Sequence, residues 1–319
     1  MTRAEQSMSE PLLHTHQIFR GHQELLDDAV RNRAFYAALR KRVTADSAVL
    51  DIGAGTGIWA IAAAMMGARR VVAIEKDAQL TALIHNLVRE NGVQDRVEVI
   101  EGDSRDIELA REFDVLISET IGNLGFDEQI VPTLIDAQKR FLKRRGVLIP
   151  SSIALVAAPA CLKSLSKKIP SGVPVSCNYF NSLSLNIPVV LGNKSNLRIV
   201  SDRKEMIRVE LATIRKPPEL RNLAAHWKLK DTTDVNCFAV WVEATLTEGV
   251  ELSTLDTTSW SPIIYLIKPF IQGQGELEFK LDLSEKSNYW SASLSNRGSE
   301  ETQAYSPVLA FAALNAHRG

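Results

Sequence analysis

The sequence predicts an α/β protein in which a doubly wound parallel sheet is followed by a domain of antiparallel strands. In the first half of the chain, short apolar runs alternate with segments of helical periodicity, the pattern of parallel strands joined by crossover helices. After Pro150, segments of alternating apolar and polar residues lie between turn-rich pieces, as in antiparallel strands. We therefore expect a helical segment over 1–44, a parallel-sheet domain over 45–150 and a β-barrel or sandwich over 151–319.

Each expected element follows from the spacing of its apolar residues. Ahead of the sheet, apolar residues recur at roughly helical spacing over Gly21–Val43 and predict one helix. The expected parallel strands are Ala48–Ile52, Arg70–Ile74, Val97–Glu101, Phe113–Ser118 and Gly146–Ile149. The helices expected between them are Gly57–Met66, Ala78–Glu90 and Gln129–Leu142. The clearest strands after Pro150 are Phe238–Leu246, Ile263–Ile267 and Glu276–Leu283.

The composition, 45% hydrophobic and 24% charged residues, is ordinary for a soluble globular protein. The net charge of −1 creates no global field that would attract nucleic acid or an anionic membrane. Cys161, Cys177 and Cys237 are widely separated, which argues against a disulfide framework and a zinc site, so we expect no metal. The N-terminal residues lack a signal-peptide core, and the apolar stretch Trp59–Ala68 is too short to cross a bilayer. We therefore expect a cytoplasmic protein.

A glycine-rich turn, Gly53-Ala54-Gly55-Thr56-Gly57, follows the first strand and leads into a helix. Glycines let the backbone pass close to a ligand and adopt torsion angles that a Cβ atom forbids. A dinucleotide fingerprint would place its last glycine at position 58, where this chain has Ile58. The spacing therefore favours a ligand without a pyrophosphate. The residues expected to bind it here are Asp51, Gly53, Gly55 and Gly57.

Acidic residues at two successive strand ends indicate the nature of this ligand. Glu75 ends the second strand, where a carboxylate can accept hydrogen bonds from both ribose hydroxyls. The third strand ends close to Asp103 and Ser104, where an acid or a backbone amide can read an adenine amino group. A plain structural turn would need the glycines but not the acids. We interpret the region as a binding site for S-adenosylmethionine, the methyl donor.

Two glutamates follow the fourth strand at a defined spacing. Ser118-Glu119 begins a loop, Gly122 follows, and Glu128 closes the loop nine residues after Glu119. This register resembles the double-glutamate loop of protein arginine methyltransferases, and the resemblance extends over about residues 12–158. It implies methyl transfer to a guanidinium nitrogen, with Glu119 and Glu128 as the catalytic residues and Glu119 also close to the donor.

The chemistry of a guanidinium explains why two carboxylates would be needed. The group is planar and stays charged, and its forked donors can be held by two carboxylates from different sides. Two neighbouring carboxylates repel each other, so the loop is most stable with a cation between them. Holding the guanidinium places one nitrogen in line with the donor's methyl group. Taken singly, Glu119 and Glu128 also fit ordinary acids of a loop and of a helix start.

The helix ahead of the first strand resembles, over His22–Arg31, the helix that folds over the donor in the same family. By this resemblance Arg31 would bind the donor's carboxylate, a contact that arginine makes in bidentate form. Leu25 takes the place of a methionine near the reacting nitrogen. Asp28 falls on the same helical face as Arg31 and is expected at the acceptor. The alternative is a solvated face on which Asp28 and Arg31 pair.

The chain departs from the family around the acceptor. Family members carry Tyr-Phe-x-x-Tyr ahead of this helix, and the equivalent positions here are Leu12, Leu13 and His16. Thr120 and Asn123 occupy positions in the glutamate loop that are usually a bulky aromatic pair. These changes leave the assignment of the donor in place and open the identity of the acceptor.

A second departure lies in the β-domain. The family's Thr-His-Trp loop is matched by Thr258-Ser259-Trp260, so Ser259 and Trp260 are expected to bind substrate, and Asp28 would lose its histidine partner. The segment His226-Trp227 reads like the second half of that motif but precedes an earlier strand, and we interpret it as a coincidence.

The expected acceptor is an arginine in a protein or peptide, or a free arginine-like small molecule. A methyltransferase for another amine, a hydroxyl or RNA and a non-catalytic relative that binds the donor are the alternatives. The segment Cys177–Asn181 is the candidate dimerisation arm and predicts a homodimer. Lys139, Arg140, Lys143, Arg144 and Arg145 could form a nucleic-acid patch, but we interpret them as cations at a helix C-terminus and do not expect nucleic acid as a partner.

Overall fold

The computed structural model describes residues 3–126, 128–163, 186–229, 235–267, 275–284, 287–296 and 299–305. The chain forms two compact units. The first comprises Met1–Ile153, Val209–Pro217 and Glu243–Trp260, and the second comprises Ala154–Arg208, Pro218–Val242 and Ser261–Gly319. Two later segments, Val209–Pro217 and Glu243–Trp260, thus belong to the first unit. A division of the chain into consecutive domains would assign them to the last domain. The predicted domain limits at 44 and 150 stay predictions.

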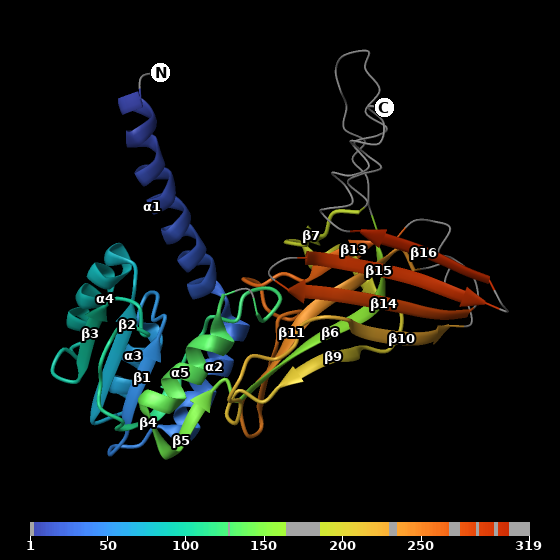
Figure 1. The fold of residues 1–319 in the computed structure, drawn as a ribbon. Coiled ribbons are helices and arrows are strands. Elements are labelled where there is room, and N and C mark those ends of the chain that lie inside the picture. Colours follow the sequence, from blue (N-terminus) through green and yellow to red (C-terminus); the bar gives the residue numbers. More distant parts are fainter. Residues whose placement is uncertain are drawn as a thin grey trace. The chain divides into compact units, whose positions relative to one another are not determined.

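A parallel sheet forms the centre of the first unit, in the order β3-β2-β1-β4-β5 (Figure 1). Its strands are β1 (Ala48–Ile52), β2 (Arg70–Glu75), β3 (Val97–Glu101), β4 (Phe113–Ile117) and β5 (Leu142–Ile149). The crossover helices are α3 (Ile58–Met65), α4 (Ala78–Glu90) and α5 (Ile130–Arg140). The strand order reverses beside β1, and such switch points are where doubly wound sheets bind ligands. The predicted fold of this region is confirmed.

The central strand β1 explains why the sheet forms where it does. All five of its residues are buried, and Val49 is paired with Val71 on one side and Val115 on the other. A strand covered on both faces needs a continuous apolar run, because each side chain meets a helix or a neighbouring strand. The exception is Asp51, whose carboxylate is turned to the start of α3.

The single helix predicted over Gly21–Val43 is wrong, because α1 (Arg3–Asp27) and α2 (Ala29–Arg42) meet at Asp28. Asp28 caps α2, and its Oδ1 accepts hydrogen bonds from the amides of Val30 at 3.1 Å and Arg31 at 3.0 Å. The Asn32 side chain donates to the Leu26 carbonyl at 2.7 Å and so satisfies the end of α1. Asp28 therefore does not share a helical face with Arg31. Apolar residues keep their spacing through the break, so periodicity alone does not reveal it.

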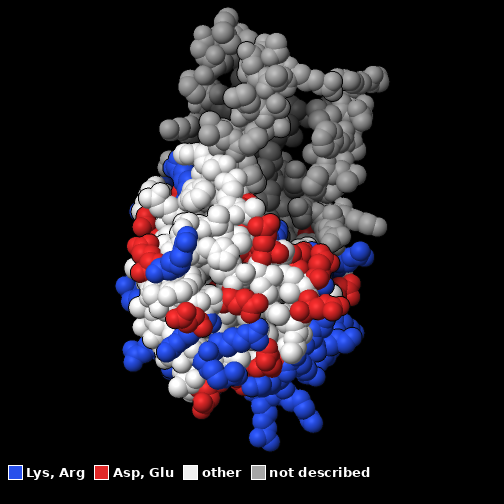
Figure 2. Space-filling view, turned by 90° about the vertical axis from the view of Figure 1, so that its left-hand side faces the viewer, with Lys and Arg blue, Asp and Glu red and all other residues white. Residues whose placement is uncertain are grey.

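Strand β5 begins at Leu142 and not at Gly146 as predicted. Phe113 pairs with Leu142 and Val115 with Val147, so Lys143–Gly146 form a bulge opposite Asp114. The interpretation of Lys143–Arg145 as cations at a helix C-terminus is therefore wrong. Only Lys139 and Arg140 lie in the last turn of α5. Figure 2 shows Lys and Arg side chains gathered at the lower end of one face of the molecule.

Antiparallel strands make up most of the rest, as predicted. One sheet has the order β10-β14-β15-β16 and the other the order β7-β13-β11-β6-β8, with β12 paired to β11 and β9 to β6. The strands are β6 (Ser152–Leu162), β7 (Val189–Val190), β8 (Leu197–Ile199), β9 (Lys204–Val209), β10 (Leu223–Leu229), β11 (Cys237–Thr247), β12 (Val250–Ser253), β13 (Ile263–Leu266), β14 (Gly275–Ser284), β15 (Ser287–Asn296) and β16 (Ser299–Tyr305), with a short 3₁₀ helix at Lys194–Asn196.

The core of the second unit is aromatic. Phe279 stacks on Phe238 with ring centroids 4.6 Å apart, and Tyr265 and Trp290 contact the same cluster. Trp227, adjacent to His226, is buried against Phe238. Among the helices of the described ranges, none combines the length and the apolarity that a bilayer crossing requires.

Candidate active site

A cavity of about 810 Å³ lies in the first unit, beside the carboxyl ends of β1 and β2. Its volume falls within the range of small-molecule sites. It is bordered by α1, the glycine turn and the segment after β4. The predicted cofactor residues on its wall are Arg31, Gly53, Gly55, Glu75, Asp103, Ser104 and Glu119, and the predicted acceptor residues are Leu25, Glu119 and Glu128. Asp28, Asp51, Gly57, Ser259 and Trp260 are not on the wall.

The glycine turn brings bare backbone to the cavity. Gly53 and Gly55 have φ angles of 69° and 58°, in the left-handed region that favours glycine. A Cβ atom on Gly55 would lie 2.9 Å from His22 Nε2, and one on Gly53 would lie 2.8 Å from Thr120 Cγ2. Both neighbours also border the cavity. Glycine is therefore required at these positions for conformation and for space.

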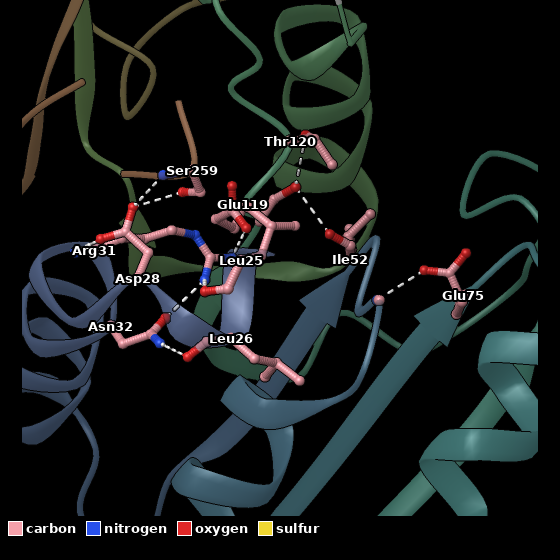
Figure 3. Close-up of polar contacts among 12 residues, drawn as sticks. Leu25, Leu26, Asp28, Arg31, Asn32, Ile52, Glu75, Glu119, Thr120 and Ser259 are labelled. Atoms are coloured by element: carbon pink, nitrogen blue, oxygen red, sulfur yellow. Dashed lines mark hydrogen bonds and ion pairs between the residues drawn. The ribbon is translucent and has the colours of Figure 1, made fainter. Parts of the chain in front are cut away.

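Glu75 is buried and held in place by backbone amides at the end of β2. Its Oε2 accepts a hydrogen bond from Gly55 N at 2.8 Å (Figure 3). Its Oε1 accepts one from Asp77 N at 3.0 Å. A carboxylate has about four acceptor positions, so two remain for a ligand. The arrangement fits the predicted contact with a ribose.

Asp103 and Ser104 lie just after the end of β3, and each accepts hydrogen bonds from an arginine side chain. Arg105 donates hydrogen bonds to the two carboxylate oxygens of Asp103, from Nε at 2.9 Å and from Nη2 at 2.6 Å. The hydrogen bonds from the Arg105 side chain and amide lower the pKa of Asp103 to about 2, so the carboxylate is ionised at neutral pH. The carbonyl of the buried Ser104 accepts a hydrogen bond from Arg140 at 2.6 Å.

Asp51 lies behind the glycine turn. Its Oδ2 accepts a hydrogen bond from Ala60 N, in the first turn of α3, at 3.1 Å. Its Oδ1 is buried and has no hydrogen-bond partner within the described part of the chain. Burial raises the pKa of Asp51 to about 7; the Ala60 amide opposes this shift and the charge of Glu75 adds to it. Its direct contact is with the start of α3.

Arg31 is the buried cation of the site, with 3% of its surface exposed. It forms an ion pair with Glu119 and donates to the Leu25 carbonyl at 3.1 Å and to Asn32 Oδ1 at 2.7 Å (Figure 3). Burial lowers the pKa of Arg31 to about 10, although the negative charges of Asp28 and Asp51 act to raise it. The side chain therefore stays a cation at neutral pH.

The two glutamates predicted as a pair border the same cavity. Glu119 is nearly buried in its pair with Arg31, whereas Glu128 is exposed and precedes α5. Ser118, just before Glu119, donates through Oγ to the Ile52 carbonyl at 2.9 Å and so ties this segment to the end of β1. These contacts fix the position of Glu119, and its carboxylate is paired with the guanidinium of Arg31.

Asp28 and Ser259 contact each other. Asp28 Oδ2 accepts hydrogen bonds from Ser259 N at 2.9 Å and Ser259 Oγ at 2.6 Å (Figure 3). It accepts a third from the Thr258 amide at 2.9 Å. The expectation that Asp28 lacks a partner without the histidine is therefore wrong, because serine replaces it. Burial alone would raise the pKa of Asp28, but the hydrogen bonds from Ser259, Arg31 and Thr258 together hold it below its usual value.

Sequence reasoning assigned no role to several residues on the cavity wall. His22, Trp59, Lys76 and Arg105 all border it. His22 Nδ1 lies 2.8 Å from the Ile18 carbonyl, which turns the ring over Gly55. Its spacing of three residues from Leu25 on a helix was the available signal. Lys76 directly follows Glu75, and Arg105 directly follows Ser104, two residues that were already assigned to the ligand.

Comparisons with known proteins show which families the chain resembles. Residues 35–167 match the family described as Ribosomal protein L11 methyltransferase (PrmA). An Arginine N(omega)-methyltransferase of Streptomyces achromogenes subsp. streptozoticus is 31% identical over 244 residues, 73% of this chain and 66% of the relative. This chain thus spans just under two thirds of that relative's length. Protein arginine N-methyltransferase 6 of Xenopus tropicalis is 25% identical over 282 residues, 82% of each chain.

Solved structures show the same fold. One is the Trypanosoma brucei PRMT1 enzyme-prozyme heterotetrameric complex with AdoHcy, with a TM-score of 0.75 and 21% identity over 89% of this chain and 97% of that chain. Another is protein arginine methyltransferase 10 of Arabidopsis thaliana, with a TM-score of 0.71 and 22% identity over 89% of this chain and 95% of that chain.

The parallel sheet, with the glycine turn and the acids at two strand ends, has the Rossmann-like fold of methyltransferases. Within that fold class, the chain is similar to the protein arginine methyltransferases. The resemblance inferred from the glutamate loop is confirmed, and with it the class of methyl donor that the family uses.

Proposed function

We propose that this protein is an S-adenosylmethionine-dependent N-methyltransferase that transfers a methyl group to a guanidinium nitrogen of arginine. One observation carries the proposal: Glu119 and Glu128 border the same cavity as the glycine turn and Glu75. The residues proposed to bind the donor and the two carboxylates thus line one volume.

The residues of the cavity fit the methyl donor. Glu75 would bind the ribose, Asp103 and Ser104 the adenine, and Arg31 the carboxylate, with backbone approach at Gly53 and Gly55. Gly57 would shape the turn, and Asp51 would support it from behind through α3. When bound, the donor supplies an electrophilic methyl group on a sulfonium.

The acceptor guanidinium would be held by Glu119 and Glu128 from different sides. The two carboxylates neutralise the cation and fix the direction of its attacking nitrogen, which converts an encounter into a positioned reaction. Leu25 would form the apolar wall beside that nitrogen. Asp28, Ser259 and Trp260 would act on the acceptor side through the 258–260 loop, which Asp28 fastens to α2.

The acceptor is an arginine side chain of a protein or peptide, or free arginine. The name of the Streptomyces relative, an arginine methyltransferase, supports testing the free amino acid beside peptides. A homodimer remains part of the proposal, and its candidate arm, Cys177–Asn181, lies outside the described residues. The cytoplasmic location stays a prediction.

Incubation with methyl-labelled donor and a panel of free arginine, arginine-rich peptides and a lysine-rich control peptide tests the proposal. Label on arginine nitrogen alone is expected. Labelling of the lysine peptide, or of RNA added to the panel, would favour the other acceptor class. Calorimetry that detects no donor binding would remove both enzyme assignments.

A further inference from the structure

The guanidinium of Arg31 lies within a cage of three aromatic rings. Its Cζ is 5.4 Å from the ring centroid of Trp59, 5.7 Å from that of Trp260 and 5.9 Å from that of Phe35. The rings come from three segments: α2, the start of α3 and the 258–260 loop. Each distance is within the range in which a cation is attracted to a ring face.

We propose that Trp59 is a positioning residue that, with Phe35 and Trp260, holds the Arg31 guanidinium where it meets the carboxylate of the methyl donor. The inference rests on the proposed function, because it assigns Arg31 to the donor. It adds a residue, Trp59, that no motif had singled out for this role.

The polar contacts of Arg31 leave one nitrogen of its guanidinium without a hydrogen-bond acceptor among the described residues. Its Nη atoms bind Glu119, the Leu25 carbonyl and Asn32. Its Nε is buried and has no hydrogen-bond acceptor within the described ranges. A buried cation that lacks one hydrogen bond depends on other electrostatic contacts, and cation–π attraction is strongest where water is excluded. The three rings provide that attraction.

The cage is itself rigid. Trp59 stacks on Phe35 with ring centroids 5.2 Å apart and an interplanar angle of 25°. Both rings are buried, with exposures of 5% and 0%. Trp260 follows Ser259, whose amide and hydroxyl are bound to Asp28 at 2.9 and 2.6 Å. Rings fixed in this way determine the direction in which Arg31 presents its donors, so their loss releases the guanidinium to other orientations.

Comparing two ligands distinguishes an effect that acts through the position of Arg31 from a general change in the shape of the cavity. S-adenosylhomocysteine carries the carboxylate that Arg31 would bind, and methylthioadenosine lacks it but keeps the adenosine part. Calorimetry measures both affinities for wild type, Trp59→Leu, Trp59→Phe and Arg31→Ala, and for the double variant Trp59→Leu/Arg31→Ala. Thermal unfolding is recorded for each protein as the control for folding.

We expect Trp59→Leu to lower the affinity for S-adenosylhomocysteine by about tenfold. Trp59→Phe keeps a ring and should retain most of the wild-type affinity. The affinity for methylthioadenosine should stay within about twofold of wild type. In the Arg31→Ala background, adding Trp59→Leu should cause no further loss of affinity for S-adenosylhomocysteine. Equal weakening of both ligands, or a full additional loss in that background, would overturn the inference. If Trp59→Leu does not fold, Trp260→Leu compared with Trp260→Phe decides by the same comparison of ligands. Failure of wild type to bind S-adenosylhomocysteine would instead overturn the proposed function.

Discussion

Asp28 and Ser259, 231 residues apart in the chain, are joined by two hydrogen bonds, from the serine amide at 2.9 Å and the serine hydroxyl at 2.6 Å. The same carboxylate caps α2 through Val30 and Arg31. One buried side chain thus connects the helix that carries Arg31 to the loop that carries Trp260. Ser259 does not titrate near neutral pH, so this connection is insensitive to pH in the range where a histidine would change charge.

Replacement of Ser259 by alanine removes the hydroxyl donor and leaves the two amide donors to Asp28. A hydrogen bond to a charged, buried acceptor contributes about 1.5 to 3 kcal/mol, and we expect the free energy of unfolding to fall by about that amount. Urea denaturation measures it. Thr258→Ala is the matched control, because Thr258 contributes only its amide to Asp28 and its loss should change stability by less than about 0.5 kcal/mol. Equal effects of both substitutions would contradict this account of the loop.

Gly55→Ala should abolish donor binding, because the added Cβ would lie 2.9 Å from the His22 ring at the cavity wall and the φ of 58° is strained for alanine. Gly67→Ala is the control for strain alone: its φ is 98°, and nothing lies within 4 Å of an added Cβ. Each substitution should cost about 1 to 3 kcal/mol of stability. Only Gly55→Ala should lose affinity for S-adenosylhomocysteine in calorimetry, and unchanged affinity would separate the turn from the ligand.

Asp51→Asn should change how stability depends on pH. The pKa of Asp51 is raised in the folded state from 3.8 to about 7, so between these values the folded protein binds the proton more tightly than the unfolded chain does. The free energy of unfolding therefore falls as pH rises through this range. Asparagine cannot ionise, yet its amide oxygen can still accept from Ala60, so this part of the fall should disappear.

The measurement is urea denaturation of both proteins at several pH values from about 4 to about 8, because other carboxylates titrate in both and cancel in the difference. Asp51→Asn should gain stability relative to wild type with rising pH. A difference that stays constant across the range would show that Asp51 keeps its usual pKa.

Glu119→Gln and Glu128→Gln should each lower kcat by about a hundredfold or more, because each removes a charge that orients the guanidinium. The loss in the double variant should be smaller than the product of the single losses, since the pair acts as a unit. Glu119→Gln also leaves Arg31 buried without its ion-pair partner, at a cost of about 3 to 5 kcal/mol in stability. Glu128 is exposed, so Glu128→Gln should fold like wild type. Full turnover by Glu128→Gln would remove it from the clamp.

Several features were readable from local pattern. A strand buried on both faces must be a continuous apolar run, so β1, β2 and β4 were predicted within one or two residues. The glycine turn and the acids at the strand ends were readable for the same reason, since torsion angles and strand direction are properties of short segments. Parallel strands bring their carboxyl ends to one edge, which placed Glu75, Asp103 and Glu119 on one cavity.

Contacts between distant segments were decided only in the folded chain. The spacing of apolar residues continues through Asp28, yet hydrogen bonds from Val30, Arg31, Thr258 and Ser259 end one helix there and begin another. The pairing of Arg31 with Glu119, 88 residues away, likewise follows from the way helix and strand pack. Such contacts depend on which surfaces meet in three dimensions, and periodicity along the chain carries no information about that.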